Sequence, residues 1–223
     1  MELSYWQSRW KKGKTGFHMP DGYPSLEKQW PNLGLPEHPS VLVPLSGKSL
    51  DLIILEHLGA TVTGVEISRV AIDDFMIENN RDYTMDQFAG FTLFRSGRIT
   101  IWEGDFFKFP EKKNGKFDLI YDKAALVALP KPMRQRYAEK VLTIAGDTTP
   151  ILLHHFIYPQ EQMPGPPFSV PMEELQTYFA ARYTFTLLEE NTIPSKNSIP
   201  FVRRGLKSNL KEQLLLLNPL QNM

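Results

Sequence analysis

Residues 43–49 read Val43-Pro44-Leu45-Ser46-Gly47-Lys48-Ser49, an apolar run that ends in a glycine turn. Glu66 ends the next apolar run, close to the spacing of about 20 residues at which an acidic side chain binds a ribose in doubly wound folds. Ligands of such folds lie beyond the carboxyl ends of the strands, so Glu66 is the best candidate for a ribose ligand. A glutamate that simply faces solvent at a strand end is the alternative.

The same stretch argues against two phosphate-binding loops. A P-loop needs a glycine five residues before Gly47, and Leu42 occupies that position. A full G-x-G-x-x-G loop, which brings the backbone close to a dinucleotide pyrophosphate, is also absent. A ligand with a ribose and no phosphate fits better, and S-adenosylmethionine is such a ligand.

Apolar runs alternate with amphipathic stretches, the pattern of a parallel sheet with crossover helices. We expect strands at 41–45, 61–65, 99–102, 117–121 and 151–157, helices at 49–58, 68–79, 132–144 and 172–181, and two closing β-like runs at 184–188 and 212–217. The fold expected is α/β: a Rossmann-like, doubly wound, mostly parallel seven-stranded sheet with a C-terminal antiparallel hairpin. We expect residues 1–223 to form one domain, in which residues 1–39 are an N-terminal helical arm that covers the site.

Composition limits the classes of ligand. The 25 basic and 25 acidic residues balance, which argues against nucleic acid as a partner. No stretch approaches the roughly 20 apolar residues that span a bilayer, so we expect a cytoplasmic protein with no membrane partner, and we expect a monomer. There is no cysteine, and His154 and His155 are adjacent on a predicted strand and point to opposite faces, so we expect no metal site.

Two pairs of residues, each with at least one aromatic ring, are candidate cofactor contacts. Asp105 and Phe106 follow the third strand at the edge expected for Glu66, where an adenine needs an apolar wall and a polar group. The alternative is that Phe106 and Phe107 are ordinary core residues, and for Phe107 we expect this. Trp6 and Trp10 share a helical face, so they either anchor the arm or border a sulfonium cation, which aromatic rings attract.

Asp122 and Lys123 directly follow the buried strand expected at 117–121. They are candidates for substrate contact at the same edge of the sheet. The alternative is an exposed ion pair of little energetic weight. His18 lies in the N-terminal arm, from which it could reach the pocket.

Six segments resemble the thiopurine S-methyltransferase family, in the family's order. They are YWQSRW (5–10), GKTGFH (13–18), PLSGK (44–48), VEIS (65–68), IYDKAALVA (120–128) and PGPPFSVP (164–171). The resemblance implies that the following residues contact the cofactor: Trp6, Trp10, Phe17, Leu45, Glu66, Asp105 and Phe106. We expect Lys123 to contact the cofactor as well.

The resemblance also implies that the substrate lies near Lys123 and near a basic loop with Arg203 or Arg204. His18 is a further candidate for substrate binding because of its place in the arm. The family often has arginine at Lys123 and cysteine at Ser46, and the first difference bears on substrate preference.

The reaction expected is methyl transfer from S-adenosylmethionine to the sulfur of a small aromatic or heterocyclic thiol. Lys123 would favour the thiolate, and Asp122 would orient Lys123 as its catalytic partner. The alternatives are a methyltransferase that acts on selenium, tellurium, oxygen or nitrogen, and a noncatalytic S-adenosylmethionine-binding protein.

Overall fold

The computed structural model describes residues 3–16, 18–110 and 116–220. Contacts divide the chain into two compact units, Met1–Tyr121 and Asp122–Met223. The single domain expected over residues 1–223 stays a prediction. Within the described ranges, no helix is both long and apolar enough to cross a membrane.

The first unit begins with the expected helical arm, formed by α1 (Leu3–Lys11), α2 (Pro24–Gln29) and the short η1 (Trp30–Asn32). Pro24 occupies the first turn of α2, where a missing N–H group has no cost. The backbone N–H of Tyr23 donates to Asp51 Oδ1 at 2.7 Å, and the Tyr121 hydroxyl donates to Asp51 Oδ2 at 3.2 Å. The fully buried Asp51 therefore joins the arm to the sheet.

The sheet of the first unit has the strand order β3-β4-β5-β2-β1-β6. Its elements are β1 (Ser40–Pro44), α3 (Asp51–His57), β2 (Thr61–Glu66), α4 (Arg69–Glu78), β3 (Thr84–Phe88), β4 (Phe91–Ser96), β5 (Ile99–Glu103), η2 (Phe106–Lys108) and β6 (Leu119–Lys123). Strands β5, β2, β1 and β6 pair in parallel. Their apolar runs are almost wholly buried, as the pattern predicts for a parallel sheet covered on both faces.

The antiparallel hairpin β3–β4 was not expected. Ala89 and Gly90 connect its strands, both with positive φ (52° and 83°), as in a two-residue hairpin turn. Every residue of β3 from Thr84 to Gln87 is exposed, so the strand carries no apolar run. The described residues form nine strands rather than the seven expected.

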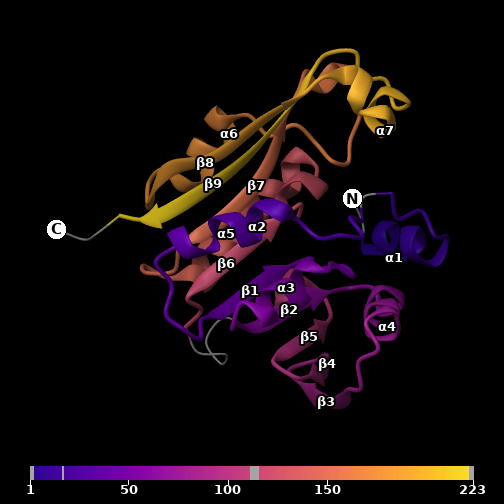
Figure 1. Ribbon diagram of the computed structural model, residues 1–223, viewed down its shortest axis with the longest axis vertical. Helices are drawn as coiled ribbons and strands as arrows, with labels where there is room; N and C mark the ends of the chain where they lie inside the picture. The colour runs from indigo at the N-terminus through magenta and orange to yellow at the C-terminus, as the bar shows by residue number, and fades with distance from the viewer. Residues whose placement is uncertain (1–2, 17, 111–115, 221–223) are drawn as a thin grey trace. The chain divides into compact units, whose positions relative to one another are not determined.

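The second unit contains the antiparallel strands in the order β7-β9-β8, which run beside one another in Figure 1. Its elements are η3 (Leu126–Ala128), α5 (Lys131–Ala145), β7 (Ile151–Ile157), η4 (Gln160–Gln162), α6 (Met172–Phe179), β8 (Tyr183–Ile193), η5 (Ser195–Asn197), α7 (Ile199–Val202) and β9 (Leu210–Pro219). The C-terminal hairpin is confirmed, and both of its strands are longer than expected. A register shift between Leu187 and Glu189 interrupts β8.

One ion pair stabilises the amino-terminal edge of the parallel strands in the first unit. Arg81 donates from two nitrogens to both carboxylate oxygens of Glu56, at 2.6 and 2.9 Å, and also to the backbone oxygen of Ser96 at 2.8 Å. Burial alone raises the pKa of Glu56, but hydrogen bonds from Arg81 and from the Arg98 backbone hold it below its ordinary value. The pair thus joins the end of α3 to the β4–β5 connection.

Replacement of Arg81 by methionine should lower the free energy of unfolding by about 2 kcal/mol, because it leaves a half-buried carboxylate without its partner. The matched control is Arg95→Met, since Arg95 is 3.9 Å from Asp86 and both side chains are exposed. That variant should cost under about 0.5 kcal/mol. Urea denaturation measures both values, and equal losses would contradict the bracing role of Arg81.

Candidate functional site

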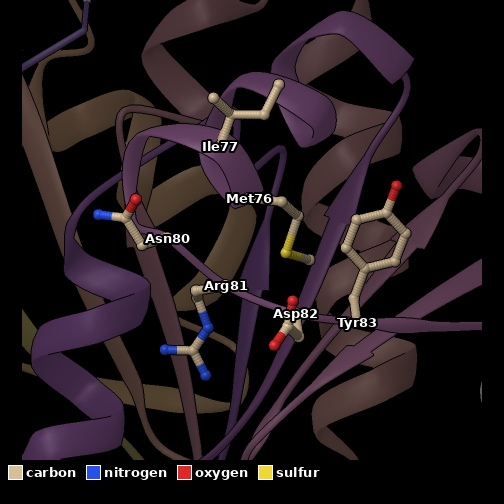
Figure 2. A pocket seen from close by; sticks show the side chains of 6 residues that line it. All are labelled: Met76, Ile77, Asn80, Arg81, Asp82 and Tyr83. Atoms are coloured by element: carbon tan, nitrogen blue, oxygen red, sulfur yellow. The ribbon is translucent and has the colours of Figure 1, made fainter.

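The open cavity in Figure 2 lies away from the expected site. It measures about 380 Å³ and is lined by Met76, Ile77, Asn80, Arg81, Asp82 and Tyr83. Helix α4 starts beside the carboxyl end of β2 and runs back along the sheet, so its end lies at the opposite, amino-terminal edge. The guanidinium of Arg81 is already occupied by Glu56. The carboxyl edge of the strands is therefore the better candidate.

Glu66 is buried at the end of β2, with 5% of its surface exposed. Its Oε2 accepts the backbone N–H of Gly47 at 2.8 Å, and its Oε1 accepts that of Ser68 at 2.7 Å. Burial raises the pKa of Glu66 to about 7, although these N–H groups oppose the shift. Because a carboxylate offers about four acceptor positions, it can still accept hydroxyl donors. The solvent-facing alternative for Glu66 is wrong.

The glycine turn after β1 is tightly wound and lies against the arm. Leu45 and Gly47 both have positive φ, 48° and 55°. A Cβ atom on Gly47 would lie 3.1 Å from Cζ2 of Trp10, which is itself buried. Trp10 thus packs on the turn that Glu66 holds.

The other described candidates of the arm, Trp6 and His18, are half-buried. Trp6 makes an edge contact with Tyr5, with ring centroids 5.2 Å apart. Phe17 lies outside the described residues.

The end of β5 adjoins the end of β2. The N–H of Gly104 donates to the backbone oxygen of Glu66 at 2.8 Å, which places Asp105 directly after this contact. Asp105 caps η2 by accepting the N–H of Phe107 at 3.0 Å. Phe106 is buried at 1% exposure and Phe107 is half-buried, so the expectation that Phe107 is the core residue is wrong. The first unit therefore gathers the turn at Leu45, Glu66 and Asp105 at one edge of the sheet.

In the second unit, Asp122 is fully buried and holds the turn that follows it. Its Oδ1 accepts the N–H groups of Ala125 and Leu126 at 3.0 and 3.1 Å, and its Oδ2 accepts the Tyr137 hydroxyl at 2.8 Å. Burial raises the pKa of Asp122 to about 6, against these donors. Lys123 is half-buried at the end of β6. An exposed ion pair between the two residues is therefore excluded.

The proline-rich loop, residues 163–171, is fastened at several points. The N–H of Phe168 donates to the backbone oxygen of Val127 at 2.7 Å, in the turn that follows Lys123. The Tyr158 hydroxyl donates to the backbone oxygen of Pro167 at 2.7 Å. The buried Arg134 pairs with Glu174 at 2.8 Å and also contacts the loop backbone. These contacts hold the loop against η3, Tyr158 and α5.

The remaining candidates of the second unit are peripheral or structural. Arg203 and Arg204 are exposed after α7. Burial raises the pKa of Tyr158, against a hydrogen bond from Gln160 and the charge of Arg204. His154 contacts Glu212 at 2.6 Å and His155 contacts the Val170 backbone oxygen at 2.8 Å, so the two histidines have separate partners.

Sequence reasoning missed Tyr137 and Arg134. Both lie on the buried face of α5 among apolar residues. Polar side chains on an apolar helical face were the available signal, but their partners are 15 and 40 residues away in the chain.

Comparison with known proteins agrees with this architecture. A family model described as thiopurine S-methyltransferase matches residues 1–217. A thiopurine S-methyltransferase of Pseudomonas fluorescens is 40% identical over 176 residues, 79% of each chain. One of Bordetella pertussis is 39% identical over 206 residues, 92% of this chain and 94% of the relative.

Solved structures with similar folds are more distant in sequence. A methyltransferase dependent on S-adenosylmethionine from Anabaena variabilis has a TM-score of 0.65 and 14% identity, covering 98% of this chain and 95% of its own. The 1,6-didemethyltoxoflavin-N1-methyltransferase of Burkholderia thailandensis, solved with S-adenosylhomocysteine bound, has a TM-score of 0.60 and 14% identity over 97% and 87% of the two chains.

The fold is that of the methyltransferases that use S-adenosylmethionine. The chain belongs to the thiopurine S-methyltransferase family, and the methyl donor of that family is S-adenosylmethionine.

Gly47→Ala should destabilise the protein more than Gly13→Ala. Both glycines have positive φ, 55° and 61°, which costs an alanine about 1 to 2 kcal/mol. Only at Gly47 does the new methyl group also meet the Trp10 ring, whereas no atom lies within 4 Å at Gly13. Thermal unfolding followed by tryptophan fluorescence measures the difference. Equal losses in the two variants would show that Trp10 does not pack on the turn.

Proposed function

We propose that this chain transfers the methyl group of S-adenosylmethionine to the sulfur of a small aromatic or heterocyclic thiol. The observation that carries the proposal is the buried carboxylate of Glu66, held by the Gly47 turn beneath Trp10 at the carboxyl edge of the sheet. These groups fit a ribose-bearing ligand that lacks phosphate, because they combine a carboxylate acceptor with an aromatic face and a short turn. We propose action as a cytoplasmic monomer.

Glu66 would accept hydrogen bonds from the ribose hydroxyls. Asp105 would meet the adenine, with Phe106 forming the apolar wall behind it. Trp10 and Trp6 would present aromatic faces to the sulfonium. Further contacts are proposed from Leu45, Phe17 and Lys123. When bound, the cofactor supplies an electrophilic methyl group, so the protein needs mainly to position the acceptor and exclude water.

Lys123 would stabilise the thiolate form of the acceptor by its positive charge. His18, Arg203 and Arg204 are proposed to contact the rest of the substrate. Asp122 was expected to take part in catalysis by orienting Lys123. Because its oxygens accept two backbone N–H groups and the Tyr137 hydroxyl, we propose instead that it holds the turn beside Lys123.

The affinity for S-adenosylhomocysteine should increase as the pH rises from 6 to 8. The pKa of Glu66 is about 7 because burial disfavours the charge, and the ionised carboxylate that forms above this pH is the better acceptor for ribose hydroxyls. Calorimetric Kd values should fall at most about tenfold per pH unit below the pKa and then level off. Glu66→Gln should bind more weakly and lose this dependence. A wild-type Kd that is flat across the window would contradict the role of Glu66.

Wild-type protein should release S-adenosylhomocysteine when it is given S-adenosylmethionine together with thiophenol or a thiopurine. A noncatalytic protein would bind the cofactor without this release.

Lys123→Met should lower kcat/KM for thiols about tenfold or more and move the pH optimum upward, since the thiol regains its free pKa. Lys123→Arg should retain activity. Lys131→Met, at an exposed position on α5, is the control. If Lys123→Met matches this control at every pH, Lys123 is not a substrate residue.

A further inference from the structure

Tyr137 is a buried hydroxyl that the proposed reaction does not use directly. It lies on α5 with no exposed surface, and its hydroxyl donates to Asp122 Oδ2 at 2.8 Å. The other oxygen of Asp122 accepts the N–H groups of Ala125 and Leu126. Tyr137 therefore fixes the rotation of a carboxylate that in turn holds the backbone of the next turn.

That turn is under backbone strain. Ala124 has a φ of 68°, in the left-handed region that is unfavourable for a residue with a Cβ atom. Such a conformation persists only when surrounding contacts determine it. The two hydrogen bonds to Asp122 span Ala124, and they are the contacts that close the turn. Lys123 immediately precedes the strained residue.

The turn is also hydrogen-bonded to the proline-rich loop. Val127, in η3 directly after the Asp122 contacts, accepts the N–H of Phe168 at 2.7 Å. A change in the orientation of Asp122 would therefore alter the backbone on two sides, at Lys123 and at Phe168. The Tyr137 hydroxyl is linked to both through Asp122.

We propose that Tyr137 is a positioning residue for methyl transfer, which acts through Asp122 to set Lys123 and the proline-rich loop. This inference rests on the proposed function, in which Lys123 faces the thiol. Without the hydroxyl, Asp122 Oδ2 loses its donor in a fully buried setting, and a buried carboxylate in that state rotates toward another donor. Rotation weakens the bonds to Ala125 and Leu126.

The test compares Tyr137→Phe with Tyr183→Phe. Tyr183 is the matched control because it is also buried in the second unit and donates its hydroxyl to a backbone oxygen, that of Thr149, at 3.0 Å. Both variants should lose some thermal stability. Tyr137→Phe should lower kcat/KM for thiophenol about tenfold, in line with the cost of a small misplacement, and its Kd for S-adenosylhomocysteine should be unchanged. Tyr183→Phe should keep wild-type kinetics.

Asp122→Asn gives a second, independent variant. The asparagine oxygen can accept the same two N–H groups while its amide donates to the Tyr137 oxygen, so the turn is kept and the charge is removed. Positioning predicts that most thiol activity survives. A loss as large as that of Lys123→Met would show that the charge of Asp122 matters, and would overturn the inference even if Tyr137→Phe failed to fold.

The proposed function and the role of Tyr137 can be contradicted separately. If wild-type protein releases no S-adenosylhomocysteine with any thiol, the proposed function is wrong. If wild type is active and Lys123→Met is impaired, but Tyr137→Phe and Tyr183→Phe have the same kinetics, only the role of Tyr137 is overturned.

Discussion

The first unit depends on a carboxylate that is buried where a strand ends. Moving a carboxylate out of water is costly unless hydrogen-bond donors surround it, and Glu66 obtains them from Gly47 and Ser68. The glycine turn after β1 and the start of α4 are consequently fixed to the same side chain. Trp10 then packs on that turn, so the N-terminal arm is positioned by the same interaction.

Asp122 repeats this arrangement in the second unit. It too is buried near a strand end and accepts backbone N–H groups from the turn that follows, here those of Ala125 and Leu126. Asp51 provides a third case, since it joins the backbone of Tyr23 to the hydroxyl of Tyr121. Each carboxylate thus fixes an irregular segment to the strand beside it by hydrogen bonds. Irregular segments that are held this way can carry a binding site on a rigid frame.

The sequence was informative where burial is continuous. Strand β7 was predicted with the bounds observed, because residues 151–157 are apolar enough to be distinguished from their surroundings. The β3 strand was missed because its side chains face solvent and only the Ala89-Gly90 turn marks the hairpin. Glu66 could be proposed from its spacing alone, and its role as a ribose ligand stays a prediction. Tyr137 could not, because its partner is set by the packing of α5 rather than by any local pattern.

The most direct measurement of the central claim is a double-mutant cycle between Glu66 and the ribose of the cofactor product. Calorimetry would compare S-adenosylhomocysteine with its 2′,3′-dideoxy analogue on wild type and on Glu66→Ala. The account predicts that loss of the hydroxyls weakens binding to wild type by about 1 to 3 kcal/mol, the usual loss for a hydrogen bond to a charged group, and has little effect on the variant. Equal penalties on both proteins would contradict the assignment of Glu66 as the ribose ligand.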